Sequence, residues 1–154
     1  MEHYSQNYNI ERNDIANAGT VASMTKRALR NRGLSREFIK QVTIGVYEAE
    51  INVVIHSYGG TAHVEIADEY VEITFQDKGP GIENIEQALT KGFSTASSYA
   101  IENGFGAGMG LPNIEAVSDE MDLRSSEDGT YLRIKFDITE SCYDSWIFTT
   151  IQSY

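Results

Sequence analysis

The sequence predicts a single α+β domain, because helical and strand patterns occur in separate parts of the chain. Apolar residues recur at helical spacing between Ile15 and Leu29 and again between Phe38 and Ile55. Residues 61–77 and 120–138 instead alternate between apolar and polar side chains, as half-buried strands do. At 154 residues the chain is long enough to enclose one hydrophobic core.

The chain is acidic and has a single cysteine. Its formal net charge of −11 disfavours nucleic acid and anionic membranes as principal partners. One cysteine, Cys142, allows no internal disulfide and favours a reducing compartment. Residues 1–20 lack the apolar core of a signal peptide, and no run of ~18 apolar residues predicts a membrane span. We therefore expect a cytoplasmic protein that binds neither nucleic acid nor membrane.

The first third of the chain predicts one strand and two helices. Tyr4–Ile10 alternates weakly and is expected to be a strand. Asn13 or Asp14 is the expected N-cap of the first helix, which Gly33 closes. The second helix is expected to begin after Ser35, which is an N-cap residue, and to end before Gly59-Gly60.

The second helix carries three polar residues on one face. Glu48, Asn52 and His56 are spaced four residues apart, so they lie above one another along the helix. Apolar residues surround them, and a buried carboxylate or amide is costly unless it is bound. These side chains either bridge neighbouring elements or bind a ligand.

The hairpin of residues 61–77 ends in an acidic residue that two glycines follow. Its strands are expected to meet at the turn Asp68-Glu69. In Asp77-Lys78-Gly79-Pro80-Gly81 the glycines allow a planar ring to approach the backbone, and the carboxylate can accept a hydrogen bond from an exocyclic amine. A plain turn after a strand fits the same pattern.

Residues 83–110 form a long glycine-rich connection with one helical piece, Ile85–Thr90, and predict a lid. The glycines of 104–110 come directly before a short helix, Leu111–Val117. N–H groups at such a helix start make an anion site that suits phosphates. The pattern is neither a Walker A nor a Rossmann motif. Strands 120–125 and 130–138 follow.

Three groups of residues, in this order, resemble the N, G1 and G2 boxes of the GHKL ATP-binding superfamily. They are Glu48-x-x-x-Asn52, Asp77-x-Gly79-x-Gly81 and Gly106-x-Gly108-x-Gly110. Residues 52–56, 92–95 and 129–134 narrow the resemblance to the anti-sigma-factor serine/threonine kinases and the related switch kinases. The resemblance implies a two-layer α/β sandwich, the Bergerat fold, in which helices cover one face of a mixed, mostly antiparallel sheet.

The resemblance also implies a role for each box in binding ATP with Mg²⁺. Asn52 would offer its side-chain oxygen to the metal, and Glu48 matches the position of the general base. Asp77 would accept a hydrogen bond from the adenine amino group. The other implied ATP-binding residues are Gly79, Gly81, Ser94, Thr95, Gly106, Gly108, Gly110, Leu111 and Thr130. His56 is expected to make a structural hydrogen bond.

The function that the resemblance implies is an ATP-dependent serine/threonine protein kinase of the anti-sigma-factor type. Its substrate would be a serine on a STAS-type anti-anti-sigma protein, and it would also bind a sigma factor. Two other functions stay open. One is a non-catalytic module whose partner binding is gated by nucleotide, and the other is a histidine-kinase-like ATPase domain.

The resemblance divides the chain into an ATP-binding domain, residues 1–140, and a C-terminal tail, residues 141–154. The tail includes Tyr143, Trp146 and Phe148, which is too aromatic a composition for a solvated end. We expect it to pack on the domain or at the interface of a homodimer.

Overall fold

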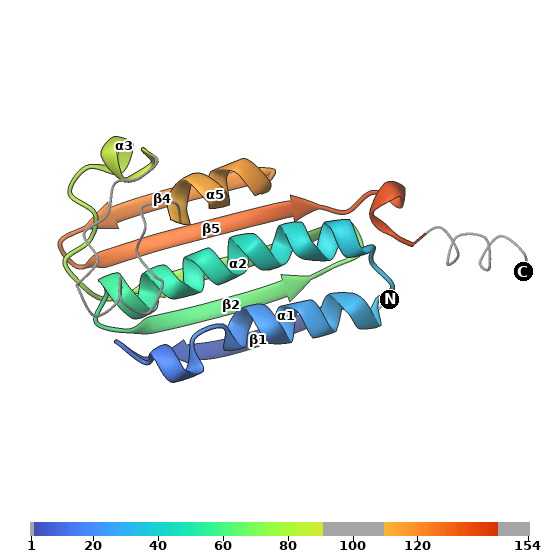
Figure 1. Cartoon of the computed structure of the whole chain (residues 1–154), viewed down its shortest axis with the longest axis horizontal. Coiled ribbons are helices and arrows are strands. Elements are labelled where there is room, and N and C mark those ends of the chain that lie inside the picture. The colour runs from blue at the N-terminus through green and yellow to red at the C-terminus, as the bar shows by residue number, and fades with distance from the viewer. Residues whose placement is uncertain (1, 91–109, 145–154) are drawn as a thin grey trace, which may run out of the picture.

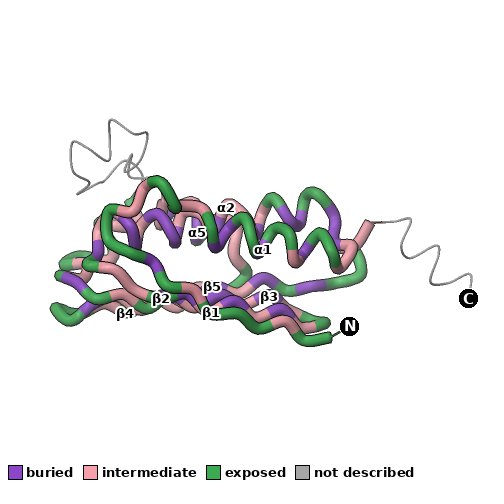
Figure 2. The backbone as a smooth tube through the Cα atoms, turned by 90° about the horizontal axis from the view of Figure 1, so that it is seen from below, coloured by how far each residue is buried: buried purple, intermediate pink, exposed green. Residues whose placement is uncertain are grey.

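The computed structural model describes residues 2–90 and 110–144, which form two layers (Figures 1 and 2). One layer is a sheet and the other is a set of helices on one of its faces. The strands are β1 (Tyr4–Ile10), β2 (Gly60–Ile66), β3 (Tyr70–Asp77), β4 (Glu120–Ser126) and β5 (Gly129–Asp137). The helices are α1 (Thr20–Asn31), α2 (Arg36–His56), α3 (Ile85–Ala88) and α5 (Gly110–Val117), with 3₁₀ turns η1 (Ile15–Asn17) and η2 (Glu140–Cys142). The expected α+β sandwich is confirmed.

The sheet has the spatial order β1-β2-β3-β5-β4, so the last strand lies between β3 and β4. All four pairings between the described strands are antiparallel, in agreement with the mostly antiparallel sheet that was expected. The hairpin predicted for residues 61–77 is confirmed, because Ile66 pairs with Val71 across a short turn. This order places the ends of β3 and β4 and the start of β5 at the same edge of the helical layer, beside the end of α2 (Figure 1).

The core lies between the helices and one face of the sheet. Alternate residues of the central strands are buried there, as the period of two requires. These are Ala62, Val64, Ile66, Val71, Ile73, Phe75, Leu132, Ile134 and Phe136. From the other layer, α2 buries Val42, Val46, Ala49 and Val53 among others. The long helix α2 is thereby held in a fixed position over β3 and β5, with α1 on one side and α5 on the other.

Helix α2 begins as the sequence predicts. Ser35 has extended backbone angles, and its side chain accepts a hydrogen bond from the N–H of Phe38. This is the N-cap arrangement that satisfies one of the free N–H groups at a helix start. Glu37 in the first turn adds a favourable charge at the positive end of the helix dipole.

Helix α1 begins later than the sequence predicts. Asn13 or Asp14 was expected as its N-cap, whereas the helix begins at Thr20 and Gly19 is the N-cap. Asp14 instead accepts hydrogen bonds from Asn17, and residues 15–17 form the separate turn η1. The left-handed conformation of Gly19, with φ of 99°, separates the turn from the helix.

The N–H groups at the start of α1 are satisfied by Glu50 of α2. Its carboxylate accepts from Gly19, Val21 and Ala22 at 3.0, 3.1 and 3.0 Å. Glu50 is 2% exposed, and burial raises the pKa of its carboxyl while the N–H donors oppose that shift. Glu50 therefore acts as an N-cap from another helix and fixes α1 against α2.

Replacing Glu50 by Ala should lower the free energy of unfolding by about 2–4 kcal/mol, because three backbone donors at a buried helix start lose their acceptor. Urea denaturation followed by circular dichroism measures this. Glu48→Gln, on the same helix, serves as the matched control and should change the value by less than about 1 kcal/mol. An unchanged urea midpoint in Glu50→Ala would show that the cap is dispensable.

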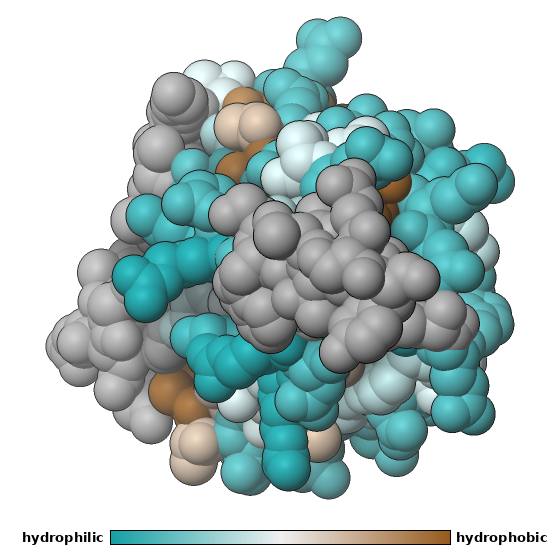
Figure 3. All heavy atoms as spheres, turned by 90° about the vertical axis from the view of Figure 1, so that its right-hand side faces the viewer, coloured by the Kyte–Doolittle hydropathy of each residue, from teal (hydrophilic) through white to brown (hydrophobic). Residues whose placement is uncertain are grey.

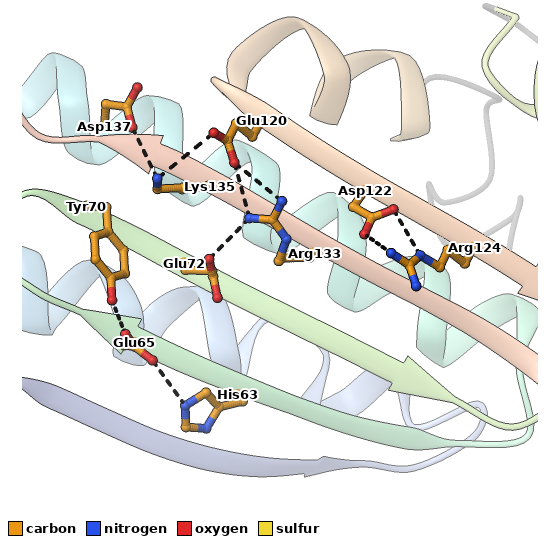
Figure 4. Close-up of polar contacts among 10 residues, drawn as sticks. All are labelled: His63, Glu65, Tyr70, Glu72, Glu120, Asp122, Arg124, Arg133, Lys135 and Asp137. Carbon is orange, nitrogen blue, oxygen red and sulfur yellow. Dashed lines mark hydrogen bonds and ion pairs between the residues drawn. The ribbon is translucent and has the colours of Figure 1, made fainter.

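The face of the sheet away from the helices is polar. Arg133 of β5 lies between Glu72 of β3 and Glu120 of β4, at 3.2 and 3.3 Å (Figure 4). Figure 4 also shows Tyr70 donating to Glu65, and Arg124 paired with Asp122. Such cross-strand pairs suit a face in contact with water. Two layers are therefore sufficient for this fold.

Where described residues are visible in Figure 3, the face is mostly hydrophilic, and the apolar residues seen there form small separate groups. Of the large hydrophobic residues in 2–90 and 110–144, Met24 and Tyr58 are exposed. Within these same ranges, no helix combines the length and apolarity that crossing a membrane requires.

The beginning of the C-terminal tail pairs with the turn between α1 and α2. Ser35 donates its N–H to the carbonyl of Cys142 at 2.7 Å, and Asp144 donates to Gly33 at 3.2 Å. Tyr143, which forms a bridge with Leu34, packs against the core. Trp146 and Phe148 lie outside the described residues. The packing of residues 141–154 as a unit and the homodimer stay predictions.

Candidate functional site

Glu48 and Asn52 of α2 converge on the start of α5. A Cβ atom built on Gly110 would lie 3.2 Å from Glu48 Oε2 and 3.3 Å from Asn52 Oδ1. Both distances are shorter than an ordinary contact, so the start of α5 approaches α2 closely because residue 110 has no side chain. The expectation that Glu48 and Asn52 lie on one face of the helix agrees with this geometry, and the structure adds that this face meets Gly110.

The oxygen atoms at this point suit a magnesium ion. Mg²⁺ prefers oxygen ligands, keeps several waters and binds through one or two protein groups together with substrate phosphates. Asn52 Oδ1 and the Glu48 carboxylate are hard oxygen donors next to each other. Within the described residues, no three His, Cys, Asp or Glu side chains are grouped to hold a metal by themselves. These two donors fit a metal ion whose remaining ligands come from a bound phosphate and from water.

Asp77 lies at the end of β3 and is tied to β5. Its Oδ1 accepts the N–H of Thr130 at 2.9 Å. Burial raises the pKa of the Asp77 carboxyl, and the Thr130 hydrogen bond opposes that shift. An ionised carboxylate has lone pairs beyond the one that Thr130 uses, so Asp77 can accept from a second donor such as an amino group.

The glycines after Asp77 hold the following loop against the β4–β5 turn. Gly81 has φ of 72°, and a Cβ there would lie 2.0 Å from the carbonyl oxygen of Ser126. No side chain fits in that space, and the backbone conformation favours glycine. Gly79 donates its N–H to Asp128 at 3.4 Å. The glycines thus let this loop pack closely on the β4–β5 turn, and the approach of a planar ring to its backbone stays a prediction.

Backbone hydrogen bonds connect the end of α2 to the loop after Asp77. Tyr58 donates to the carbonyl of Lys78 at 2.7 Å, and Lys78 donates to Gly59 at 3.0 Å. Asn52 lies about 6 Å before the end of α2, measured along the helix axis. The structure thus brings Glu48 and Asn52 of the N box and Asp77 of the G1 box to one end of the helical layer. The first two lie on α2, and Asp77 lies at the end of β3 beside the start of β5.

The remaining predicted site residues have different outcomes. Leu111 is half-buried and packs against the core at the start of α5. Thr130 lies directly beside Asp77. Ser94, Thr95, Gly106 and Gly108 lie outside the described residues, as does most of the predicted lid, of which the structure describes residues 83–90 and 110. Burial lowers the pKa of His56, which favours the neutral imidazole, and its structural role stays a prediction.

Two polar residues near the site were not found from the sequence. Asn113 of α5 donates its side-chain amide to Glu48 Oε1 at 3.5 Å. Ser125 of β4 contacts both Thr130 and the loop after Asp77. Each acts on a residue far away in the chain, so no local spacing could have indicated it.

Acidification should weaken ATP binding as Asp77 becomes protonated. Because burial raises the pKa of the Asp77 carboxyl, this loss should begin at a higher pH than it would for a solvent-exposed aspartate. Only the ionised group accepts with both oxygens. Below that pKa, each unit of pH should therefore raise the ATP Kd by up to about tenfold. Calorimetric titrations from pH 7 downward through the pKa of Asp77 measure the slope. Asp77→Asn should bind ATP more weakly at pH 7 and give a flatter profile, and parallel profiles would contradict the assignment.

Comparisons with known proteins show the family of the chain. A family model described as a histidine kinase-like ATPase domain matches residues 12–136. The chain is 38% identical over 98 residues to an anti-sigma F factor of Heyndrickxia coagulans, which covers 58% of this chain and 63% of that relative. It is 30% identical over 98 residues to the serine/threonine-protein kinase RsbT of Bacillus subtilis (strain 168), covering 60% of this chain and 68% of the relative.

A solved structure supports the fold. The crystal structure of the RsbU and RsbW domains of Rv1364c from Mycobacterium tuberculosis matches 85% of this chain and 32% of that chain, with a TM-score of 0.56 and 19% identity. The family model spans most of the described fold and all three boxes. The chain therefore belongs to the histidine kinase-like ATPase family, and the resemblance to GHKL proteins of the anti-sigma type is confirmed.

Proposed function

We propose that this chain is an ATP-dependent serine/threonine protein kinase of the anti-sigma-factor type that acts in the cytoplasm. The observation that carries the proposal is the convergence of Glu48 and Asn52 on Gly110, at the same end of the helical layer as Asp77. In this arrangement one bound nucleotide would meet Glu48 and Asn52 at its phosphates and Asp77 at its base. Relatives named as an anti-sigma F factor and as a serine/threonine-protein kinase support the same reading.

Phosphoryl transfer depends mostly on positioning and on stabilising negative charge. Asn52 would hold Mg²⁺, which supplies positive charge to the phosphate oxygens when it is bound. Asp77 would fix the adenine ring, and the N–H groups at the start of α5 would contact phosphate oxygens. Glu48, next to Asn52, would accept the proton of the attacking hydroxyl. Each of these residues is held by an element of the core.

The partners are part of the proposal: the name anti-sigma F factor of one relative supports a sigma factor, and the family resemblance of the sequence implies a STAS-type protein. The matched stretch spans 63% of the Heyndrickxia anti-sigma F factor and 68% of RsbT. We propose that the phosphorylated group is a serine on a STAS-type anti-anti-sigma protein, and that the chain also binds a sigma factor. The net charge of −11 favours protein partners with basic surfaces over nucleic acid.

Incubation of the chain with Mg-ATP and candidate STAS-type proteins tests this function. The expected product is a phosphoprotein that is stable to acid, with no product when EDTA replaces Mg²⁺. An acid-labile product would indicate transfer to histidine and favour the histidine-kinase-like alternative. Absence of transfer, together with a partner that binds only when ATP is present, would favour the nucleotide-gated binding module.

A further inference from the structure

The hydroxyl of Ser125 connects three parts of the proposed base site. Ser125 lies on β4 directly opposite Thr130 of β5. Its Oγ is 2.8 Å from Thr130 Oγ1 and accepts the N–H of Ile82 at 2.7 Å. Ile82 follows Gly81, and Thr130 donates its own N–H to Asp77. One half-buried hydroxyl thus contacts the loop after Asp77 on one side and the residue beside Asp77 on the other.

The hydrogen-bonding capacity of a hydroxyl limits what Ser125 can do. A serine hydroxyl has one proton and two lone pairs, and the N–H of Ile82 occupies one lone pair. The proton can go to Thr130 Oγ1 at 2.8 Å or to the Gly129 carbonyl at 3.4 Å. When it goes to Thr130, the threonine proton is directed elsewhere and can be donated. Without Ser125, the Thr130 hydroxyl would have no such constraint.

The loop after Asp77 depends on the same residue. Gly81 is in contact with the Ser126 carbonyl, and a Cβ on Gly81 would also lie 2.8 Å from Ser125 Oγ. The N–H of Ile82 is therefore held at a fixed place against β4. Loss of the hydroxyl would leave this half-buried N–H without its acceptor and loosen the backbone against which a base would lie.

We propose that Ser125 is a positioning residue for base discrimination, which orients the Thr130 hydroxyl and fixes residues 79–82 beside Asp77. This inference rests on the proposed nucleotide site and adds a determinant that lies on a different strand from all the box residues. It concerns the base and not the phosphates, since Ser125 contacts the loop and the strand around Asp77, whereas Asn52 and Gly110 lie on the helices.

The test is the ratio of the GTP and ATP Kd values, measured by calorimetry in the presence of Mg²⁺. Ser125→Ala should lower this ratio by about tenfold, the effect of one lost hydrogen bond. Ser125→Thr, which keeps a hydroxyl, should restore it. Ser126→Ala is the matched control, because that exposed side chain accepts only from Asp128 among the described residues and should leave the ratio unchanged.

Thr130→Val provides a second measurement that does not depend on the folding of Ser125→Ala. It removes the hydroxyl that Ser125 orients and leaves the Ser125–Ile82 hydrogen bond, so it should lower the ratio by a similar factor. In the double variant the two effects should not add, because one acts through the other.

The failures of the two proposals can be told apart. Three results would overturn the role of Ser125 and leave the nucleotide site standing. The first is a wild-type ratio in Thr130→Val or in folded Ser125→Ala, and the second is additive effects in the double variant. The third is a wild type that binds ATP and GTP equally. A wild type that binds neither nucleotide would overturn the site, and the role of Ser125 with it.

Discussion

Replacing Glu48 by Gln should remove most of the phosphotransfer activity and leave Mg-ATP binding intact. Glutamine keeps the size of the side chain and can still accept from Asn113, but it cannot take a proton from the attacking hydroxyl. A positioned general base contributes roughly 10²–10⁴ to the rate, so transfer to the partner should fall by that factor. The Kd for Mg-ATP should change by less than about threefold, because the shape of the site is conserved.

Single-turnover transfer at saturating Mg-ATP measures the rate, and calorimetry measures binding. Glu115→Gln is the matched control, since Glu115 lies on the exposed side of α5 and should leave both values unchanged. If Glu48→Gln transferred phosphate as fast as the wild type, Glu48 would not be the base. A parallel loss of binding and of transfer would instead indicate a role in holding the metal.

Replacing Asn52 by Ala should weaken nucleotide binding strongly, and only when Mg²⁺ is present. Asn52 Oδ1 is the amide oxygen that approaches Gly110 beside Glu48, and alanine leaves the metal without it. Loss of an outer-sphere group already costs 10–100-fold in metal affinity, so loss of a direct ligand should raise the Mg-ATP Kd by roughly 100-fold.

Titration of ATP in EDTA is the internal control for Asn52→Ala. There the wild type and the variant should bind with similar affinity, because no metal contact is present to lose. Circular dichroism should show an unchanged fold, since Asn52 is half-buried and the neighbouring core residues are untouched. Equal affinities of wild type and variant in Mg²⁺ would exclude Asn52 as the metal ligand.

Much of the fold could be predicted because its signals are local. The Ser35 cap acts within three residues, and α2 begins where the cap predicts. Alternation in residues 61–77 predicts a hairpin because successive side chains point to opposite faces of a strand. The approach of Glu48 and Asn52 to each other follows from a spacing of four in a helix. In each case the interacting residues are close together in the sequence.

The features that could not be predicted all depend on distant residues. Helix α1 begins at Thr20 because Glu50, about 30 positions later, satisfies its first N–H groups. The polar stripe drew attention to Glu48, although the adjacent carboxylate of Glu50 is the more deeply buried one. The hydrogen bonds of Ser125 arise only once β5 lies between β3 and β4, which no local pattern specifies.

The central claim is that one Mg-ATP binds between α2, the end of β3 and the start of β5. A crystal structure of the chain with Mg²⁺ and a non-hydrolysable ATP analogue tests it most directly. The account predicts the metal on the side-chain oxygen of Asn52, the adenine amino group within hydrogen-bond distance of Asp77, and the γ-phosphate nearest to Glu48. A nucleotide bound elsewhere, such as the pocket of about 370 Å³ lined by Tyr8, Glu11 and Asn17, would contradict the account, as would a site that stays empty at millimolar analogue.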